Sequence, residues 1–294
     1  MLDKDEFTIV KQSTKRREVM EAALVLSAME IENYIEQKEF VWYLYVAPDK
    51  LEPARTQLHL YTEENRPPAQ LAVPFTIVDD GWLGVLAYLT VIWCIPALQS
   101  YTDADLLALG RLHAEAVWAG ELWRPVTALT LHSDIAHILS NSFFGLLFGL
   151  FVGRHLGSGV GWLLVLICGA AANLLNAAIQ PDQFKAIGAS TATFACLGLV
   201  PAFGWRRGYF RGKGWARGFA PMFGAIALLA FTGGFGNERV DIVGHLFGFL
   251  AGICMGLLVA HIKLDQISKA DQQRAGFFAV FLVAIAWMFA GMSG

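Results

Sequence analysis

The chain has 294 residues, of which 55% are hydrophobic and 16% are charged. Soluble domains carry about 25% charged residues, so the composition excludes an ordinary soluble enzyme. The formal net charge of -3 does not indicate a nucleic-acid partner. Charged residues occur throughout the first part of the chain, whereas later stretches lack them over the roughly 20 residues that a spanning helix needs. The sequence therefore predicts a small soluble part followed by a polytopic membrane part.

Residues 1–66 are predicted to form a small cytoplasmic α/β domain. Apolar residues at helical spacing predict a helix over 16–29, and aromatic and β-branched residues favour strands at 31–37 and 39–47. Pro48 and Asp49 open a second helix, which gives the order α-β-β-α. Because no residue here indicates catalysis, we interpret this domain as a regulatory or contact module for a protein partner.

A linker at 67–80 contains three prolines and separates this domain from seven apolar segments. The segments are 81–98, 135–153, 160–179, 187–204, 220–234, 242–261 and 276–292. The predicted fold is an all-α polytopic membrane protein. It has a six-helix core over 81–262, and then a loop and a seventh transmembrane helix over 263–294.

Lysine and arginine residues gather in the loops on one side of the predicted bundle. The loop at 205–219 is rich in arginine, and the loop after the sixth segment holds Lys263, Lys269 and Arg274. Cytoplasmic loops carry such an excess of basic residues. The N-terminal domain is therefore predicted to lie in the cytoplasm and the C-terminus outside.

Three groups of polar residues lie in or beside the predicted spans, where such residues are costly and usually functional. They are Ser190, His245, and the run from His132 through His137 to Asn141. Each group lies about one helical turn from the outer end of its segment, which places all three in one layer. A histidine can take the proton of a serine hydroxyl, and amide or imidazole N–H groups can stabilise the oxyanion that follows. The pattern predicts a serine hydrolase site that needs no metal and no cofactor.

Four short motifs follow one another along the chain. They are Trp123-Arg124, His132-x4-His137-x3-Asn141, Gly188-Ala189-Ser190 and His245-x2-Gly248-x3-Gly252. In this order they resemble the motifs of the rhomboid family of intramembrane serine proteases, over about residues 80–262. The resemblance implies a multi-pass protein of the bacterial inner membrane whose substrates are transmembrane proteins within the lipid bilayer.

The resemblance also implies a role for single residues. Ser190 would be the nucleophile and His245 its partner in a catalytic dyad, while His137 and Asn141 would line the oxyanion hole. Phe194 would be the aromatic residue that packs against the base. No acidic third member is evident, because Asp241, one turn before His245, is interpreted as a loop or helix-start residue.

Other roles stay open at several of these positions. Trp123 and Arg124 either order the loop or serve as an interfacial aromatic residue and a snorkelling cation. His132 is interpreted as a loop or water-site residue. Gly248 and Gly252 belong to a stripe of glycines that lets another helix approach closely.

Two positions depart from the family pattern, since Thr191 and Ala195 stand where glycine is usual. We expect the Thr191 side chain to point away from the sixth segment, so that it tunes substrate preference. The alternative to a protease is a catalytically inactive rhomboid-like protein that binds membrane clients. A metalloprotease is not indicated, because the sequence lacks His-Glu-x-x-His.

The predicted orientation can be tested with reporter fusions. Fusions after residue 75 and within 206–216 should report the cytoplasm, because basic loops are retained there, and fusions near 115 or 236 should report the external side. An external signal from a fusion at 210 would invert the orientation.

Overall fold

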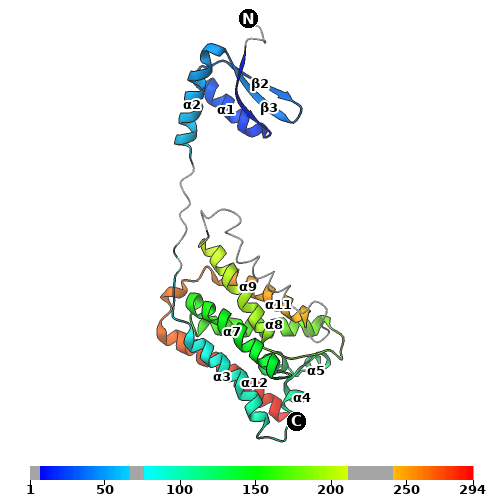
Figure 1. Cartoon of the computed structure of the whole chain (residues 1–294). Helices are drawn as coiled ribbons and strands as arrows, with labels where there is room; N and C mark the ends of the chain where they lie inside the picture. The colour runs from blue at the N-terminus through cyan, green and yellow to red at the C-terminus, as the bar shows by residue number, and fades with distance from the viewer. Residues whose placement is uncertain (1–6, 67–73, 75, 211–240, 294) are drawn as a thin grey trace. The chain divides into compact units, whose positions relative to one another are not determined.

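A computed structural model describes residues 7–66, 74, 76–210 and 241–293 (Figure 1). The contacts divide the chain into two compact units, Met1–Ala69 and Gln70–Gly294. Each unit is described by itself. The predicted fifth segment, 220–234, lies outside the described residues.

The N-terminal unit is a three-stranded antiparallel sheet with two helices. Its elements are β1 (Thr8–Ser13), α1 (Arg16–Ala28), β2 (Asn33–Lys38), β3 (Val41–Val46), a 3-10 turn (Pro48–Lys50) and α2 (Leu51–Glu64). The strand order is β1-β3-β2, and Val19, Leu26, Leu44 and Ala54 are among the residues of its core. The predicted order α-β-β-α is wrong at its start, because β1 precedes α1. Residues 8–13 become a strand by pairing with β3, a partner that lies about thirty residues further along the chain.

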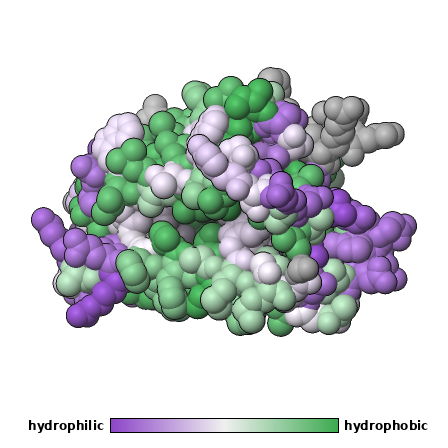
Figure 2. All heavy atoms as spheres, turned by 90° about the horizontal axis from the view of Figure 1, so that it is seen from below, coloured by the Kyte–Doolittle hydropathy of each residue, from purple (hydrophilic) through white to green (hydrophobic). Residues whose placement is uncertain are grey.

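The second unit is a bundle of long helices joined by a structured loop. The long helices are α3 (Trp82–Gln99), α7 (Ile135–Leu156), α8 (Val160–Ile179), α9 (Ser190–Arg207), α11 (Ile242–Val259) and α12 (Lys269–Met292). Among the described residues, α3, α7, α8, α11 and α12 are long and apolar enough to cross a membrane. In the space-filling view, apolar side chains cover much of the visible face and hydrophilic ones gather toward its sides (Figure 2).

Helix α9 lies inside the bundle, where α7, α8 and α11 pack around it (Figure 1). Most of its residues are buried, including two threonines, Thr191 and Thr193. It is not among the helices with the composition of a membrane span, although the sequence predicted a spanning segment there. A helix that other helices enclose does not face lipid, so its surface need not be uniformly apolar.

The segment between α3 and α7 forms several short elements that sequence analysis did not predict. They are α4 (Leu106–Gly110), β4 (Leu112–His113), α5 (Ala114–Trp118), α6 (Arg124–Thr127) and the 3-10 turn η3 (Ala128–Thr130). Strand β4 pairs with β5 (Lys185–Ala186), which directly precedes the start of α9. This pairing connects the loop to the N-terminal end of α9.

The turn between α7 and α8 is held from two directions. The Asp79 carboxylate accepts hydrogen bonds from the backbone N–H of Ser158 at 2.6 Å and from its hydroxyl at 3.0 Å. From α12, Gln272 Oε1 accepts from the N–H groups of Gly159 and Val160 at 3.1 and 2.9 Å, and its Nε2 donates to Leu156 O at 3.2 Å. The segment before α3 and the helix at the other end of the unit are therefore fastened to the same turn.

Helices α9 and α11 approach each other backbone to backbone. A β-carbon added at Gly248, Gly252 or Gly256 would overlap the carbonyl oxygens of Thr191, Ala195 and Leu199 respectively. Gly198 of α9 meets the Phe249 carbonyl of α11 in the same way. The glycines thus set the distance between these two helices, as small residues do in membrane helix pairs.

Replacing a glycine in this contact should destabilise the protein. We expect Gly252→Ala to lower the free energy of unfolding by about 1–3 kcal/mol, because the added methyl group overpacks a rigid backbone contact. Thermal unfolding in detergent would measure the change. The matched control is Gly291→Ala in α12, where an added β-carbon meets no atom within 4 Å. Equal unfolding midpoints for the two variants would contradict this account of the contact.

Candidate active site

Ser190 and His245 meet at the N-terminal ends of α9 and α11. The Ser190 hydroxyl lies 2.8 Å from His245 Nε2, which is hydrogen-bonding distance. Ser190 is the first residue of α9, three residues later than the predicted start of its segment. The delay has a local cause: Gly188 has φ +131°, a backbone conformation outside the helical region.

The imidazole ring of His245 packs against α9. The ring of Phe194, one turn after Ser190, lies 4.3 Å from the imidazole, centroid to centroid, at an interplanar angle of 33°. The His245 side chain is 6% exposed, and its Nδ1 has no hydrogen-bond partner among the described residues. Phe194 therefore restricts the ring to an orientation in which Nε2 faces Ser190.

His137 and Asn141 lie one turn apart on α7, and both line the cavity that holds Ser190. Asn141 Nδ2 is buried and has no partner among the described residues. His137 Nδ1 lies 3.4 Å from the Ser133 backbone N–H, which can only donate, so Nε2 is the nitrogen that carries the hydrogen. That nitrogen lies 2.8 Å from the place a β-carbon on Gly188 would take, so glycine here gives the imidazole access to the site.

A cavity of about 950 Å³ connects these groups. The described residues of its lining include Ser190, His245, His137, Asn141 and Phe194. Charged residues also reach it, namely Asp134, Lys185 and Asp241. The Asp134 side chain accepts from the His137 backbone N–H at 2.9 Å and caps α7, which lowers the pKa of that carboxyl.

Thr191 lines this cavity and also packs against α11. Its Cγ2 atom lies 3.3 Å from the position of an added Gly248 β-carbon, and the residue is 5% exposed. The expectation that this side chain points away from the sixth segment is therefore wrong. Gly248 leaves a hollow in α11 at this level, which the threonine methyl group fills. Gly252, one turn later, meets Ala195 of α9.

Trp123 and Arg124 lie within the loop between α3 and α7. Arg124 is 8% exposed, donates to the carbonyls of Ala108 and Arg111 at 3.0 and 2.8 Å, and pairs with Glu121 at 2.6 Å. The Trp123 indole N–H contacts the carbonyl of Leu109 at 3.4 Å. These contacts favour loop ordering over snorkelling for the pair, because the guanidinium binds carbonyls of the loop instead of facing the bilayer surface.

His132 packs beside the site and is absent from the described lining of its cavity. Its ring lies edge-on to that of His137, with centroids 5.0 Å apart. Neither ring nitrogen has a hydrogen-bond partner among the described residues. Burial, and then the neighbouring His137, lowers the pKa of His132 to about 4, so it is neutral at pH 7.

Asp241 and Asn176 support the site and were not predicted to do so together. Asp241 caps α11 by accepting from the Gly244 backbone N–H at 2.8 Å, and its other oxygen accepts from Asn176 Nδ2 of α8 at 2.6 Å. Burial raises the pKa of Asp241, which these two hydrogen bonds oppose. Sequence analysis interpreted Asp241 as a helix-start residue. The signal it missed was Asn176, a fully buried amide in an apolar span, where polar groups are costly.

Comparison with known proteins identifies the domain that carries this site. The sequence model of the rhomboid domain matches residues 119–262. Rhomboid-like protease 3 of Toxoplasma gondii is 30% identical over 179 residues, which cover 59% of this chain and 66% of that protein. Rhomboid protease GluP of Bacillus subtilis (strain 168) is 28% identical over 189 residues, 64% of this chain and 35% of that protein.

Similarity extends to plant proteins as well. Rhomboid-like protein 11 of Arabidopsis thaliana, a chloroplastic protein, is 30% identical over 161 residues, 49% of this chain and 56% of that protein. The matches thus span between 35% and 66% of the lengths of these three relatives. Together with the apolar helices, the domain match makes this an integral multi-pass membrane protein. The chain therefore contains a rhomboid domain, at residues 119–262.

Proposed function

We propose that the chain is an intramembrane serine protease that hydrolyses peptide bonds in or near the transmembrane segments of membrane proteins. The observation that carries the proposal is the 2.8 Å contact between the Ser190 hydroxyl and His245 Nε2, inside the cavity that Asn141 and His137 also line. The rhomboid domain supports the same reaction, since relatives such as GluP are named as rhomboid proteases.

In the proposed reaction, Ser190 donates its proton to His245 Nε2 as its oxygen attacks the peptide carbonyl. The base must be neutral and must carry its own hydrogen on Nδ1. As the tetrahedral intermediate collapses, the imidazolium returns the proton to the leaving amine. Water then attacks the acyl-enzyme by the same route and frees Ser190. No acidic third group is required, because Phe194 holds the imidazole in place.

The negative oxygen of the intermediate needs donors that are already in place. Asn141 offers a buried amide without a described partner, and His137 offers its Nε2–H. Both come from α7, across the cavity from α9 and α11. An unsatisfied buried amide is costly, so its presence beside Ser190 fits a donor that finds its partner only in the reacting complex.

The basic loops of the sequence support an orientation in the membrane. We assign it to the bacterial inner membrane, with the N-terminal unit in the cytoplasm, the C-terminus outside, and Ser190 near the external surface. The N-terminal unit would then be free to bind a cytoplasmic protein partner. The alternative, an inactive family member that binds membrane clients, would keep the cavity without the chemistry.

The dyad can be tested by substitution. Ser190→Ala and His245→Ala should each abolish cleavage of a model transmembrane substrate, since the two groups act as one unit. A fluorophosphonate probe should label Ser190 in the parent chain, as detected by mass spectrometry, and should leave the His245→Ala variant unlabelled. The control is Ser142→Ala, a serine of α7 whose hydroxyl donates to the Ile138 carbonyl away from the cavity. Substantial cleavage by Ser190→Ala would exclude this serine as the nucleophile, and a parent chain without cleavage or labelling would favour the inactive relative.

The oxyanion donors can be tested separately. Asn141→Ala should lower kcat by roughly 10²–10³-fold with little change in KM, because its amide acts in the transition state. The second donor at His137 would reduce the loss toward the lower limit. Steady-state kinetics on one substrate measures both constants. A change confined to KM would move Asn141 from catalysis to substrate binding.

A further inference from the structure

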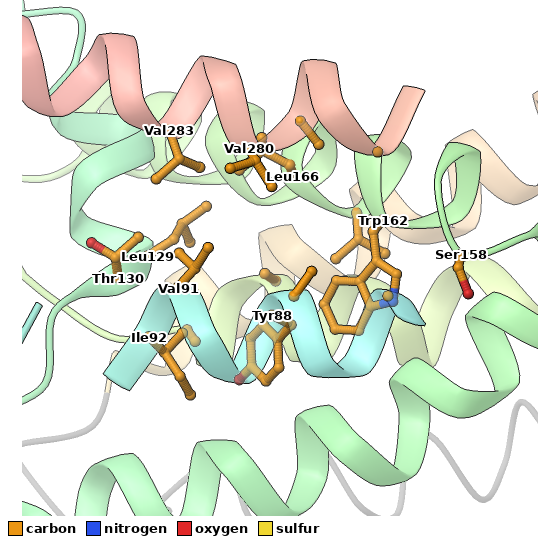
Figure 3. A pocket seen from close by; sticks show the side chains of 17 residues that line it. Tyr88, Val91, Ile92, Leu129, Thr130, Ser158, Trp162, Leu166, Val280 and Val283 are labelled. Carbon is orange, nitrogen blue, oxygen red and sulfur yellow. The ribbon is translucent and has the colours of Figure 1, made fainter. Parts of the chain in front are cut away.

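Helix α12 lies outside the matched rhomboid domain, which ends at residue 262, yet it packs on the elements that build the site. Its neighbours are α8, α6, α4 and α3. Figure 3 shows Val280 and Val283 of α12 facing a small apolar pocket opposite Tyr88 and Ile92 of α3. The pocket has a volume of about 100 Å³, and Thr130 stands at one end of it. Apolar contacts of this kind are enough to hold α12 against the bundle. A hydrogen bond from α12 to the bundle therefore has a role beyond attachment of the helix.

Trp287 makes such a contact. Its indole N–H donates to the Thr130 hydroxyl at 3.0 Å. The ring edge lies against Gly110, where an added β-carbon would overlap it. Tryptophan near a membrane surface usually turns its N–H to the interface, whereas this one turns inward to a buried threonine.

Thr130 connects this contact to the nucleophile. It is the last residue of η3, is 2% exposed, and donates to the Thr127 carbonyl at 2.7 Å. At the other end of η3, the Ala128 carbonyl accepts from the Gly188 backbone N–H at 2.9 Å. Gly188 lies two residues before Ser190 and beside His137 Nε2. One short turn thus separates the Trp287 indole from the backbone that presents Ser190.

We propose that Trp287 is a positioning residue for the Ser190–His245 site, acting through Thr130 and η3 on the backbone at Gly188. This inference rests on the proposed protease function. Helix α12 would then do more than add stability. Its outer end fixes η3, and η3 in turn holds the backbone at Gly188, just before Ser190. The inner end of α12, fastened by Gln272 to the turn between α7 and α8, has no contact with this route.

The experiment compares variants of the two hydrogen-bonding partners in the full-length protein. Trp287→Phe removes the N–H and Thr130→Val removes the hydroxyl, whereas Thr130→Ser keeps it. Phe289→Leu changes an exposed aromatic residue of the same helix, and Gln272→Leu weakens the other end of α12. Three quantities are measured for each: kcat and KM for a transmembrane substrate, the rate of fluorophosphonate labelling at Ser190, and the midpoint of thermal unfolding.

We expect Trp287→Phe to lower kcat and the labelling rate about fivefold, the effect of one net hydrogen bond, with KM unchanged. Thr130→Val should lower both rates at least as much, because it also removes the hydrogen bond to the Thr127 carbonyl. The double variant should be no slower than Thr130→Val alone, because that substitution already removes the contact with Trp287. Thr130→Ser and Phe289→Leu should match the parent chain. Gln272→Leu should lower the unfolding midpoint and leave the labelling rate unchanged. Parent-like rates in Trp287→Phe, or a lowered labelling rate in Gln272→Leu, would show that α12 only stabilises the protein. Either result would overturn the proposal.

Amide hydrogen exchange separates this inference from the protease function. Exchange at the Gly188 amide should be faster in Trp287→Phe and Thr130→Val than in the parent chain and Phe289→Leu, whether or not the protein cleaves anything. A parent chain that is not labelled at Ser190 would contradict the proposed function only. Unchanged exchange at Gly188 would contradict the positioning role, whatever the activity.

Discussion

The close backbone contact between α9 and α11 is the constraint on which the rest of the membrane unit depends. Glycines at 248, 252 and 256 bring the two helix backbones into contact over about two helical turns. Because Ser190 and His245 stand near the starts of these helices, this contact sets the 2.8 Å distance between hydroxyl and imidazole. A weak nucleophile becomes useful only at such a distance from its base, so packing and chemistry depend on the same few glycines.

The elements around this helix pair each position a different group of the site. Helix α7 brings His137 and Asn141 to the opposite side of the cavity, and α8 uses Asn176 to hold the capping carboxylate of Asp241 at the start of α11. The loop before α7 is ordered by Arg124, whose guanidinium donates to two backbone carbonyls of the loop. Arg124, Asn176 and Asp241 thus each have a hydrogen-bond partner beside the site, and Asn141 lines the cavity.

The sequence predicted the parts of this arrangement that depend on position along the chain. Ser190, His245, His137 and Asn141 were found because each lies near one end of an apolar segment, and helical rise converts position into depth. The features it missed depend on the rotation of a helix about its axis, such as the packing of Thr191 on α11. In a membrane, apolar residues occur on all sides of a helix, so periodicity does not reveal which side faces a neighbour. Partners distant in sequence, such as Asp241 and Asn176, were missed for the same reason.

The fastening of the turn between α7 and α8 has a consequence for the order of assembly. Ser158 is held by a residue 79 positions before it, and Val160 by a residue 112 positions after it. A ribosome therefore releases the first partner before this turn and the second only after another 112 residues have been added. Until α12 has entered the membrane, the Gly159 and Val160 amides lack their glutamine acceptor. The turn is thus completed only by α12, after both Ser190 and His245 have been synthesised.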